Sequence, residues 1–360
     1  MAAKKKKDVS EVEVDPDFEA AKIGDADNDF SQNPERQTEV PELDLSVTQL
    51  EGVGAQTEKK LNSFGVNSLY DICVRGAKEI EEITGVAKSK AIQWVFQSQK
   101  ILEDNNLIRK SDMSTMELLD YQENLPKLAT KSCVEVDNLF GGGLIPECTY
   151  EVYGAFGSGK TQFCNSLTVE AIRDGENVIW IDCEDTFRPR RIIEILMARG
   201  YIEDKSEAVE YLERITYIYT PNTEQLMGSI NALSETIKKV KPRIIILDGA
   251  VGQFREEYLG RGTLSERQNQ IARLMTHLKN ISYYFRCTVL FTNQVQSDPA
   301  VMFGDPIKPI GGNVVGHAST YRVYFKKSGK KRIARMVDSP EHAQIDAEFS
   351  LTAKGIEDIE

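Results

Sequence analysis

Residues 154–161 read Gly-Ala-Phe-Gly-Ser-Gly-Lys-Thr and match the phosphate-binding pattern G-x-x-x-x-G-K-[ST]. The glycines allow backbone N–H groups to converge on phosphate oxygens, Lys160 can reach the β- and γ-phosphates, and Thr161 offers a hydroxyl to Mg²⁺. A glycine-rich turn can match this pattern by chance. Here the preceding residues predict a strand and the following ones a helix whose N-terminus faces the anion. We therefore predict a site for a nucleoside triphosphate with Mg²⁺.

Two carboxylates at predicted strand ends would complete such a site. Asp248 ends an apolar strand and is predicted to hold Mg²⁺, usually through water, opposite Thr161. Glu184 follows another strand, and we favour it as the group that orients or deprotonates the attacking water. Asp182 and Asp185 compete for that role, and any one of the three carboxylates after this strand could instead cap a helix.

These side chains need a scaffold that brings distant segments together. From residue 134 onward strands alternate with helices, which predicts a mostly parallel sheet with helices on both faces. The ligand of such a sheet lies at the carboxyl ends of the strands. The predicted strands are residues 149–153, 177–182, 215–219, 243–248, 287–292, 321–326, 332–338 and 347–351, and the predicted helices are residues 161–173, 189–199, 223–240 and 264–285. Residues 131–360 are thus the predicted α/β core.

Two further segments leave the same strand ends. Residues 252–262 interleave glycines with side chains that suit contact with a single nucleic-acid strand, although a solvated loop is an equally open reading. Those side chains are Arg255, Tyr258 and Arg261. Residues 295–316 follow Gln294, are rich in glycine and proline, and carry little secondary-structure signal. A long irregular loop beside a nucleotide site is more often functional than a packing defect.

The first 130 residues differ in composition. Residues 1–44 hold thirteen acidic and six basic side chains and few aromatics, so we predict a disordered acidic arm.

Residues 45–107 predict short helices joined by glycine turns and resemble a helix-hairpin-helix DNA-binding domain. A helical bundle whose glycines are only caps is the alternative. Residues 108–130 form a polar linker. Lysines that could contact DNA phosphates are Lys59, Lys60, Lys88 and Lys90, while Trp94 and Phe96 are assigned to the core.

The composition limits the class of protein. The formal net charge of −12 excludes a uniformly basic nucleic-acid coat, although a local basic groove is compatible with it. The six cysteines form no C-x-x-C pair and are expected to be reduced and buried, and the three histidines are too dispersed for a zinc site. No apolar run approaches the ~20 residues of a membrane span. We expect a soluble, intracellular protein without a membrane partner.

Seven segments resemble, in the same order, segments of the RecA-like strand-exchange recombinases of the archaeal RadA and eukaryotic branch. They are GAFGSGKTQ, DCEDTFRPRRI, FREEYLGRGTLSERQ, TNQV, FGDPIKPIGGN, GHAST and RMVDSP. The resemblance covers about residues 45–360. It implies a RecA-type P-loop ATPase core after a small all-α helix-hairpin-helix domain, with ATP and Mg²⁺ as cofactors. It also implies a homo-oligomeric ring or filament that binds single- and double-stranded DNA and holds ATP between protomers.

The same resemblance implies individual roles. Glu184 would activate the water, Lys160 would contact phosphate, and Gln294 would link the γ-phosphate to the DNA loop that follows it. The implied ATP-binding residues are Gly154, Ala155, Phe156, Gly157, Ser158, Gly159, Lys160, Thr161, Gln162, Arg191, His317, Asp338 and Pro340. Among these, Arg191 would stack on adenine, and the last three would approach a neighbouring protomer's nucleotide. The implied DNA-binding residues are Arg255, Tyr258, Arg261, Arg267, Val295, Met302 and Phe303, and the implied metal ligands are Thr161 and Asp248.

The chain departs from the family pattern at several positions. Met113-Ser114-Thr115-Met116 stands where the family's oligomerisation segment reads Phe-x-x-Ala, and the larger Met116 puts that contact in doubt. Asp185 replaces a glycine after the catalytic Glu, and Gly249 replaces a serine after the second acidic residue. Ala343 and Gln344 replace a proline and an acidic residue, which leaves a monovalent-cation site there open.

The leading interpretation is a DNA-dependent ATPase that forms filaments on single-stranded DNA and catalyses homologous pairing and strand exchange in recombinational repair. The alternative is a non-exchanging accessory relative that binds ATP and DNA, and the departures favour it. A small-molecule P-loop kinase is a weaker third reading, because neither a lid domain nor an acceptor pocket is evident. The protein would work in the cytoplasm beside the nucleoid of an archaeal-type cell, or in the nucleus of a eukaryote.

Overall fold

The computed structural model describes residues 43–258, 260–297 and 307–359. Within it, Asp44–Glu360 form one compact unit. The predicted acidic arm lies almost wholly outside the described residues, as do Met302 and Phe303. Among the residues that are described, no helix is long and apolar enough to cross a membrane.

The N-terminal helices pack around a small core of their own. A 3₁₀ turn, η1 (Val47–Gln49), precedes α1 (Ala55–Ser63), α2 (Leu69–Thr84) and α3 (Lys88–Asp104). Gly76, with φ 73°, interrupts α2, in line with the expectation of short helices joined by glycine turns. Trp94 is buried and donates its indole N–H to the carbonyl of Glu51, which confirms it as a core residue. The assignment of Phe96 to the core is wrong: it is 69% exposed, because two positions along a helix turn a side chain to the opposite face.

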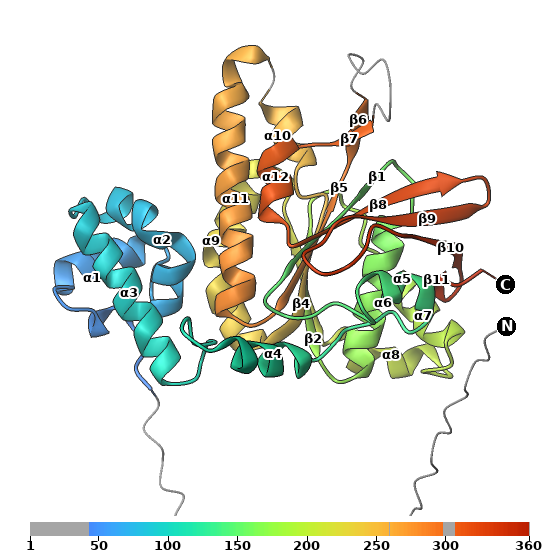
Figure 1. The fold of residues 1–360 in the computed structure, drawn as a ribbon, viewed down its shortest axis with the longest axis horizontal. Coiled ribbons are helices and arrows are strands. Elements are labelled where there is room, and N and C mark those ends of the chain that lie inside the picture. Colours follow the sequence, from blue (N-terminus) through green and yellow to red (C-terminus); the bar gives the residue numbers. More distant parts are fainter. Residues whose placement is uncertain (1–42, 259, 298–306, 360) are drawn as a thin grey trace, which may run out of the picture. The chain divides into compact units, whose positions relative to one another are not determined.

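The rest of the chain builds a nine-stranded sheet (Figure 1). Its strands are β1 (Thr149–Gly154), β2 (Asn177–Asp182), β3 (Ile215–Tyr219), β4 (Pro242–Asp248), β5 (Thr288–Asn293), β8 (Tyr321–Ser328), β9 (Lys331–Asp338), β10 (Asp346–Thr352) and β11 (Gly355–Glu357). The spatial order is β11-β10-β9-β8-β1-β5-β4-β2-β3. The strands from β8 to β3 in this order run parallel, and β9, β10 and β11 add an antiparallel extension.

Helices cover both faces of the sheet because the central strands are apolar on both sides. In β4, Ile244 and Ile246 join one buried cluster, while Ile245 and Leu247 join the other. This alternation follows from the two-residue period of a strand. The first cluster packs against α5 (Val134–Leu139), α6 (Lys160–Arg173), α7 (Pro189–Ala198) and α8 (Ala208–Leu212). The second packs against α9 (Thr223–Val240), α10 (Gly252–Glu257), α11 (Leu264–Tyr284) and α12 (Gly312–Ala318).

The strand order places four chain segments side by side at the carboxyl ends of the central strands. Strands β1, β5, β4 and β2 are parallel neighbours, so their carboxyl ends coincide. The register pairs Asp182 with Asp248 and Tyr153 with Asn293. These carboxyl ends therefore carry four parts of the predicted site. They are the phosphate loop after β1, Glu184 after β2, Asp248 at the end of β4 and Gln294 after β5.

Every strand and helix predicted for the core is present within two residues of its predicted ends, but the loops hold more structure than the sequence suggested. The linker contains α4 (Thr115–Glu123), which begins with a capping box between Ser114 and Glu117. The segment after Asp248 forms α10, held by the buried Phe254. Residues 295–316 contain the paired strands β6 (Val295–Ser297) and β7 (Ile307–Pro309) and most of α12. The S-x-x-E capping pattern was the one available signal for α4.

The cysteines agree with the expectation of buried thiols. All six lie in the described part of the chain and none forms a disulfide. Five are buried and Cys148 is half-buried. Burial raises the pKa of Cys73, Cys183 and Cys287 to about 12, so these thiols stay protonated and inert at neutral pH.

One buried carboxylate joins α2 to α11. Glu79 accepts hydrogen bonds from Arg75 on its own helix and from Arg273 on α11, the latter at 2.5 Å. Nε2 of His277, also on α11, lies 2.8 Å from its second oxygen. Burial by itself raises the pKa of Glu79, but the hydrogen bond and charge of His277 and the charge of Arg75 outweigh it and lower the pKa to about 2. The ionised carboxylate thus stabilises the contact between the N-terminal helices and the core.

We predict that Glu79→Gln lowers the free energy of unfolding at pH 7 by on the order of 3 kcal/mol, since one pKa unit corresponds to about 1.4 kcal/mol. Because the folded-state pKa lies below that of the unfolded chain, this contribution is complete above pH ~4.5 and is lost as the pH falls toward 2. Urea unfolding at pH 7 and pH 3 measures it. Glu82→Gln, which changes an exposed acid on the same helix, is the control. An equal loss at both pH values in Glu79→Gln would contradict this account.

Candidate nucleotide site and nucleic-acid loops

The phosphate loop has the backbone of an anion cradle. Gly157 and Gly159 have φ of 71° and 107°, so the chain turns sharply between β1 and α6 and the first amides of α6 are left without helical partners. Lys160 donates to the carbonyls of Gly154 and Ala155 at 2.9 and 3.3 Å. The hydroxyl of Ser158 is buried and has no hydrogen-bond partner. The loop therefore holds hydrogen-bond donors that could bind the oxygens of an anion.

Asp248 lies at the centre of a hydroxyl network. It is 1% exposed and accepts hydrogen bonds from Thr161 at 3.0 Å, Thr186 at 3.1 Å and Thr292 at 2.5 Å. Burial raises its pKa, and the hydrogen bonds from these threonines act in the opposite direction. The pairing of Thr161 with Asp248 is the geometry predicted for the two protein ligands of Mg²⁺, whose remaining ligands are water and phosphate oxygens.

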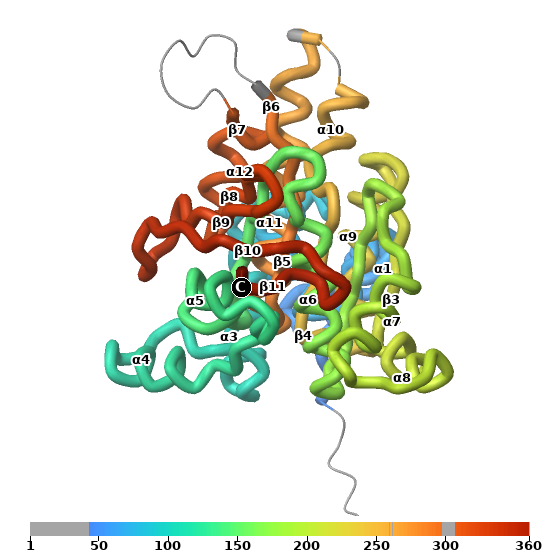
Figure 2. Tube along the Cα trace, turned by 90° about the vertical axis from the view of Figure 1, so that its right-hand side faces the viewer, coloured from blue at the N-terminus to red at the C-terminus, as the bar shows by residue number. Residues whose placement is uncertain are grey.

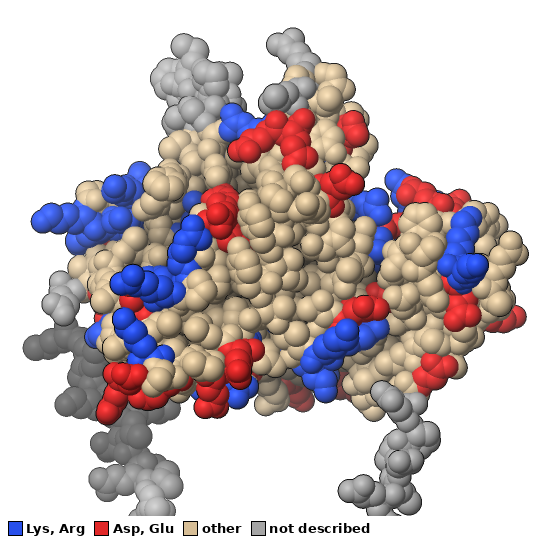
Figure 3. Space-filling view, turned by 180° about the vertical axis from the view of Figure 1, so that it is seen from behind, with Lys and Arg blue, Asp and Glu red and all other residues tan. Residues whose placement is uncertain are grey.

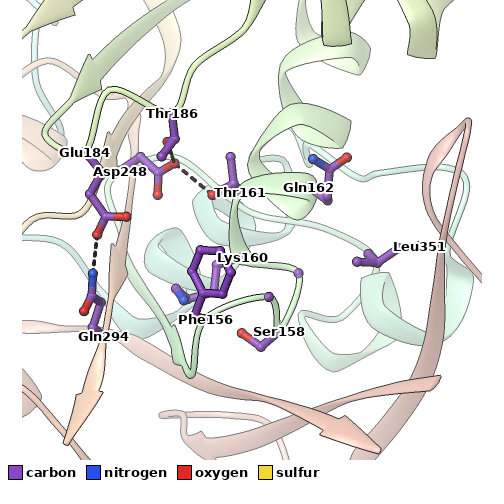
Figure 4. A pocket seen from close by; sticks show the side chains of 12 residues that line it. Phe156, Ser158, Lys160, Thr161, Gln162, Glu184, Thr186, Asp248, Gln294 and Leu351 are labelled. Carbon is purple, nitrogen blue, oxygen red and sulfur yellow. Dashed lines mark hydrogen bonds between the residues drawn. The ribbon is translucent and has the colours of Figure 1, made fainter. Parts of the chain in front are cut away.

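Glu184 is the acid that faces the pocket. Its Oε1 accepts a hydrogen bond from the side-chain amide of Gln294 at 2.7 Å (Figure 4). Asp182 is buried and accepts hydrogen bonds from the backbone N–H groups of Glu184, Thr186 and Phe187, so it shapes the turn. Asp185 is exposed, as Glu184 is, but it lies 3.5 Å from Arg188 and does not line the pocket. The geometry favours Glu184 over its two neighbours for contact with a water in the pocket.

The phosphate loop, Glu184, Asp248 and Gln294 line one pocket of about 260 Å³. Figure 4 shows their side chains around the pocket together with Phe156, which also lines it and is fully exposed. Burial in the pocket raises the pKa of Glu184, with the charge of Asp248 adding to this and the hydrogen bond from Gln294 opposing it. Burial lowers the pKa of Lys160, which the neighbouring carboxylates counteract.

These residues fit ATP with Mg²⁺. The unpartnered Ser158 hydroxyl, the free amides at the start of α6 and the Lys160 ammonium form a donor set for phosphate oxygens. Thr161 and Asp248 supply the hard oxygen ligands that Mg²⁺ prefers. When bound, the metal would neutralise charge on the phosphates.

Other predicted nucleotide contacts lie outside this pocket. Arg191 donates to Gln162 at 2.9 Å and to the carbonyl of Thr352 at 2.6 Å, so it joins α6 and α7 to the turn after β10. His317 is exposed on α12, and Asp338 and Pro340 are exposed at the end of β9. None of these four lines the pocket of its own chain. Their predicted roles in nucleotide binding stay predictions.

The two predicted DNA segments emerge from the same end of the molecule. In Figures 1 and 2, α10 lies beside the pair β6 and β7. Arg255 is exposed on α10, whereas Tyr258 is half-buried and stacks on Phe254. Arg267 on α11 and Val295 on β6 are half-buried. The side chain of Arg261 lies outside the described residues, although its backbone belongs to η3 (Arg261–Thr263).

A cationic hairpin formed by β8 and β9 was missed by the reading of the sequence. Its cations are Lys326, Lys327, Lys330, Lys331, Arg332 and Arg335. Figure 3 shows Lys and Arg side chains gathered on that side of the molecule, at its left. Arg335 pairs with Asp346 at 2.7 Å and Lys331 with Glu348 at 2.9 Å, so part of this charge is balanced within the chain. The KKSGKKR run was the available signal.

The fold and the pocket define an α/β P-loop nucleotide-binding protein of the RecA type. Residues 122–359 match the family model described as Rad51, and residues 44–100 match that of the SAM-like helix-hairpin-helix tandem. The chain is 39% identical over 323 residues to the DNA repair and recombination protein RadA of Cenarchaeum symbiosum. The aligned region covers 88% of this chain and 80% of that protein. The chain belongs to the Rad51 family.

We predict that Glu184→Gln leaves ATP affinity within a few-fold of the unmodified protein and lowers hydrolysis by roughly 100-fold or more, the usual effect of losing a general base. Titration with a fluorescent ATP analogue and phosphate release measure the two quantities. Asp185→Asn makes the same acid-to-amide change next door and should retain hydrolysis. If Asp185→Asn lowers hydrolysis as much as Glu184→Gln does, the assignment of the water-activating group is wrong.

Proposed function

We propose that the protein is an ATP-dependent DNA recombinase that forms filaments on single-stranded DNA and catalyses homologous pairing and strand exchange in DNA repair. The observation that carries the proposal is the contact between Glu184 and Gln294. It joins the candidate water-activating group to the residue from which a predicted DNA loop begins. Membership of the Rad51 family and the name of the RadA relative support the same conclusion.

The chain's own residues would divide the work at this site. Lys160, Ser158 and the amides at the start of α6 bind and orient the phosphates, while Thr161 and Asp248 hold the metal. Glu184 orients a water and accepts its proton. Because α10 and β6 begin at the same strand ends, contact with DNA and occupation of the pocket can bias one another.

The DNA contacts would come from several parts of the chain. We assign residues 45–107 to a DNA-binding domain and residues 131–360 to the ATPase core, with residues 108–130 as the linker. Arg255 and Arg267 would contact a strand held at the loops, as would the loop residues beyond the described part of the chain. The cationic β8 and β9 hairpin adds a second surface suited to phosphates.

Assembly of copies would involve an open sheet edge. In the described part of the chain the sheet ends at β3, which pairs only with β2, and Tyr217 and Tyr219 on β3 are exposed. Such an edge can accept an extended segment from another chain. The linker offers that segment: Ser114 is extended, and Met116, which is 64% exposed, lies in the first turn of α4, so this contact would require that turn to unwind. We propose that the segment around Met113 and Met116 of one copy contacts β3 of the next.

The proposed function is tested by a strand-exchange assay with ATP and Mg²⁺, using single-stranded DNA and homologous duplex. We expect exchange by the unmodified protein and a loss of several-fold or more in Arg255→Ala, together with lower DNA-stimulated hydrolysis and unchanged ATP affinity. Arg190→Ala, which removes an exposed arginine from α7, is the matched control. Filaments and hydrolysis without any exchange would instead identify a non-exchanging relative.

Assembly is tested separately by Met116→Asp. Because the Met116 side chain is exposed, the substitution should leave the fold intact. A charge placed in an apolar contact should shift light scattering from oligomer toward monomer. Phe96→Asp, which places an aspartate at a similarly exposed apolar residue on α3, is the control. Unchanged assembly in Met116→Asp, or an equal loss in both variants, would rule out the proposed linker contact.

A further inference from the structure

Three strand ends meet at Glu184. The residue itself follows β2, Gly249 follows β4, and Gln294 follows β5. The amide of Gln294 donates to Glu184 Oε1 at 2.7 Å on one side. On the other side the Glu184 side chain lies against the backbone of Gly249, where the chain turns from β4 toward α10. The candidate water-activating group is therefore in contact with Gly249, three residues before the predicted DNA segment 252–262, and with Gln294, directly before the segment 295–316.

Gly249 leaves the space that Glu184 occupies. A Cβ atom on residue 249 would lie 2.5 Å from Glu184 Cγ, 2.8 Å from Oε1 and 2.9 Å from Cδ. Non-bonded carbon atoms this close would overlap sterically. Any residue other than glycine would therefore displace the glutamate side chain. Residue 249 also has φ +89°, a conformation that glycine adopts without strain.

The backbone at Gly249 has little freedom to move away instead. Its N–H donates to the Thr292 hydroxyl at 2.9 Å, and the same threonine donates to Asp248. Ala250, the next residue, is buried and donates to the carbonyl of Thr292 at 3.2 Å. The turn is thus tied to β5, whereas Glu184 is a flexible side chain. A side chain at position 249 would break the contact between Glu184 and Gln294 before it moved the turn.

We propose that Gly249 is a positioning residue that allows Glu184 to keep its hydrogen bond to Gln294 when no DNA is bound. DNA contact at the loop that follows Gly249 breaks this hydrogen bond and frees the glutamate. This inference rests on the proposed role of Glu184 in hydrolysis. An amide hydrogen bond stabilises the carboxylate and occupies one of its acceptor sites, so a docked Glu184 is a weaker base.

Two variants test the inference, Gly249→Ala and Gly249→Ser. In both we expect hydrolysis without DNA to rise several-fold while ATP affinity stays the same, so that stimulation by single-stranded DNA falls toward one. Hydrogen exchange of residues 294–297 should also quicken, because Gln294 loses its partner. Gly175→Ala is the matched control: it has φ +79° and open space for a Cβ, so it adds backbone strain away from the site. Its stimulation ratio should equal that of the unmodified protein.

Several results would overturn the inference. If the ratio in both Gly249 variants equals that of Gly175→Ala, position 249 matters only for the backbone. If hydrolysis falls both with and without DNA while ATP still binds, the resting contact is the productive one. If the Gly249 variants do not fold, Gln294→Leu tests the same contact: a higher DNA-free rate supports the inference and a lower one overturns it. Absence of hydrolysis in the unmodified protein would instead refute the proposed function.

Discussion

The buried carboxylate of Asp248 is the constraint on which the site depends. A charge that is 1% exposed is costly unless it is hydrogen-bonded, and here three threonine hydroxyls satisfy it. Thr161 starts α6, Thr186 follows β2, and Thr292 belongs to β5. Meeting the needs of one carboxylate therefore fixes three elements relative to β4. This hydrogen-bond network thereby positions the phosphate loop and the candidate water-activating group.

The pocket unites the candidate metal and phosphate ligands but not every residue predicted to contact the nucleotide. The phosphate loop, Asp248 and Glu184 line it together, Phe156 at its wall is fully exposed, and His317 does not line it. A neighbouring copy that covers Phe156 and brings its own residues would account for both features, and would connect nucleotide binding to assembly.

Glu79 and Glu184 show two different uses of an acid in this fold. Glu79 is surrounded by cations, so its pKa falls and its charge joins the N-terminal helices to α11. Glu184 is partly desolvated in its pocket and lies near the carboxylate of Asp248, so its pKa rises. The first environment stabilises a fixed ionised group. The second keeps a group closer to the pH at which it can exchange a proton.

The sequence by itself determined the core elements, the phosphate loop and the candidates Asp248 and Glu184, because two-residue and 3.6-residue periods and a glycine motif are local signals. It did not separate Glu184 from Asp182 and Asp185. That choice came from burial and backbone hydrogen bonds around Asp182, which depend on neighbouring strands. The Glu79 contact with α11 and the space at Gly249 were likewise decided only by tertiary structure, since each depends on residues far away in the chain.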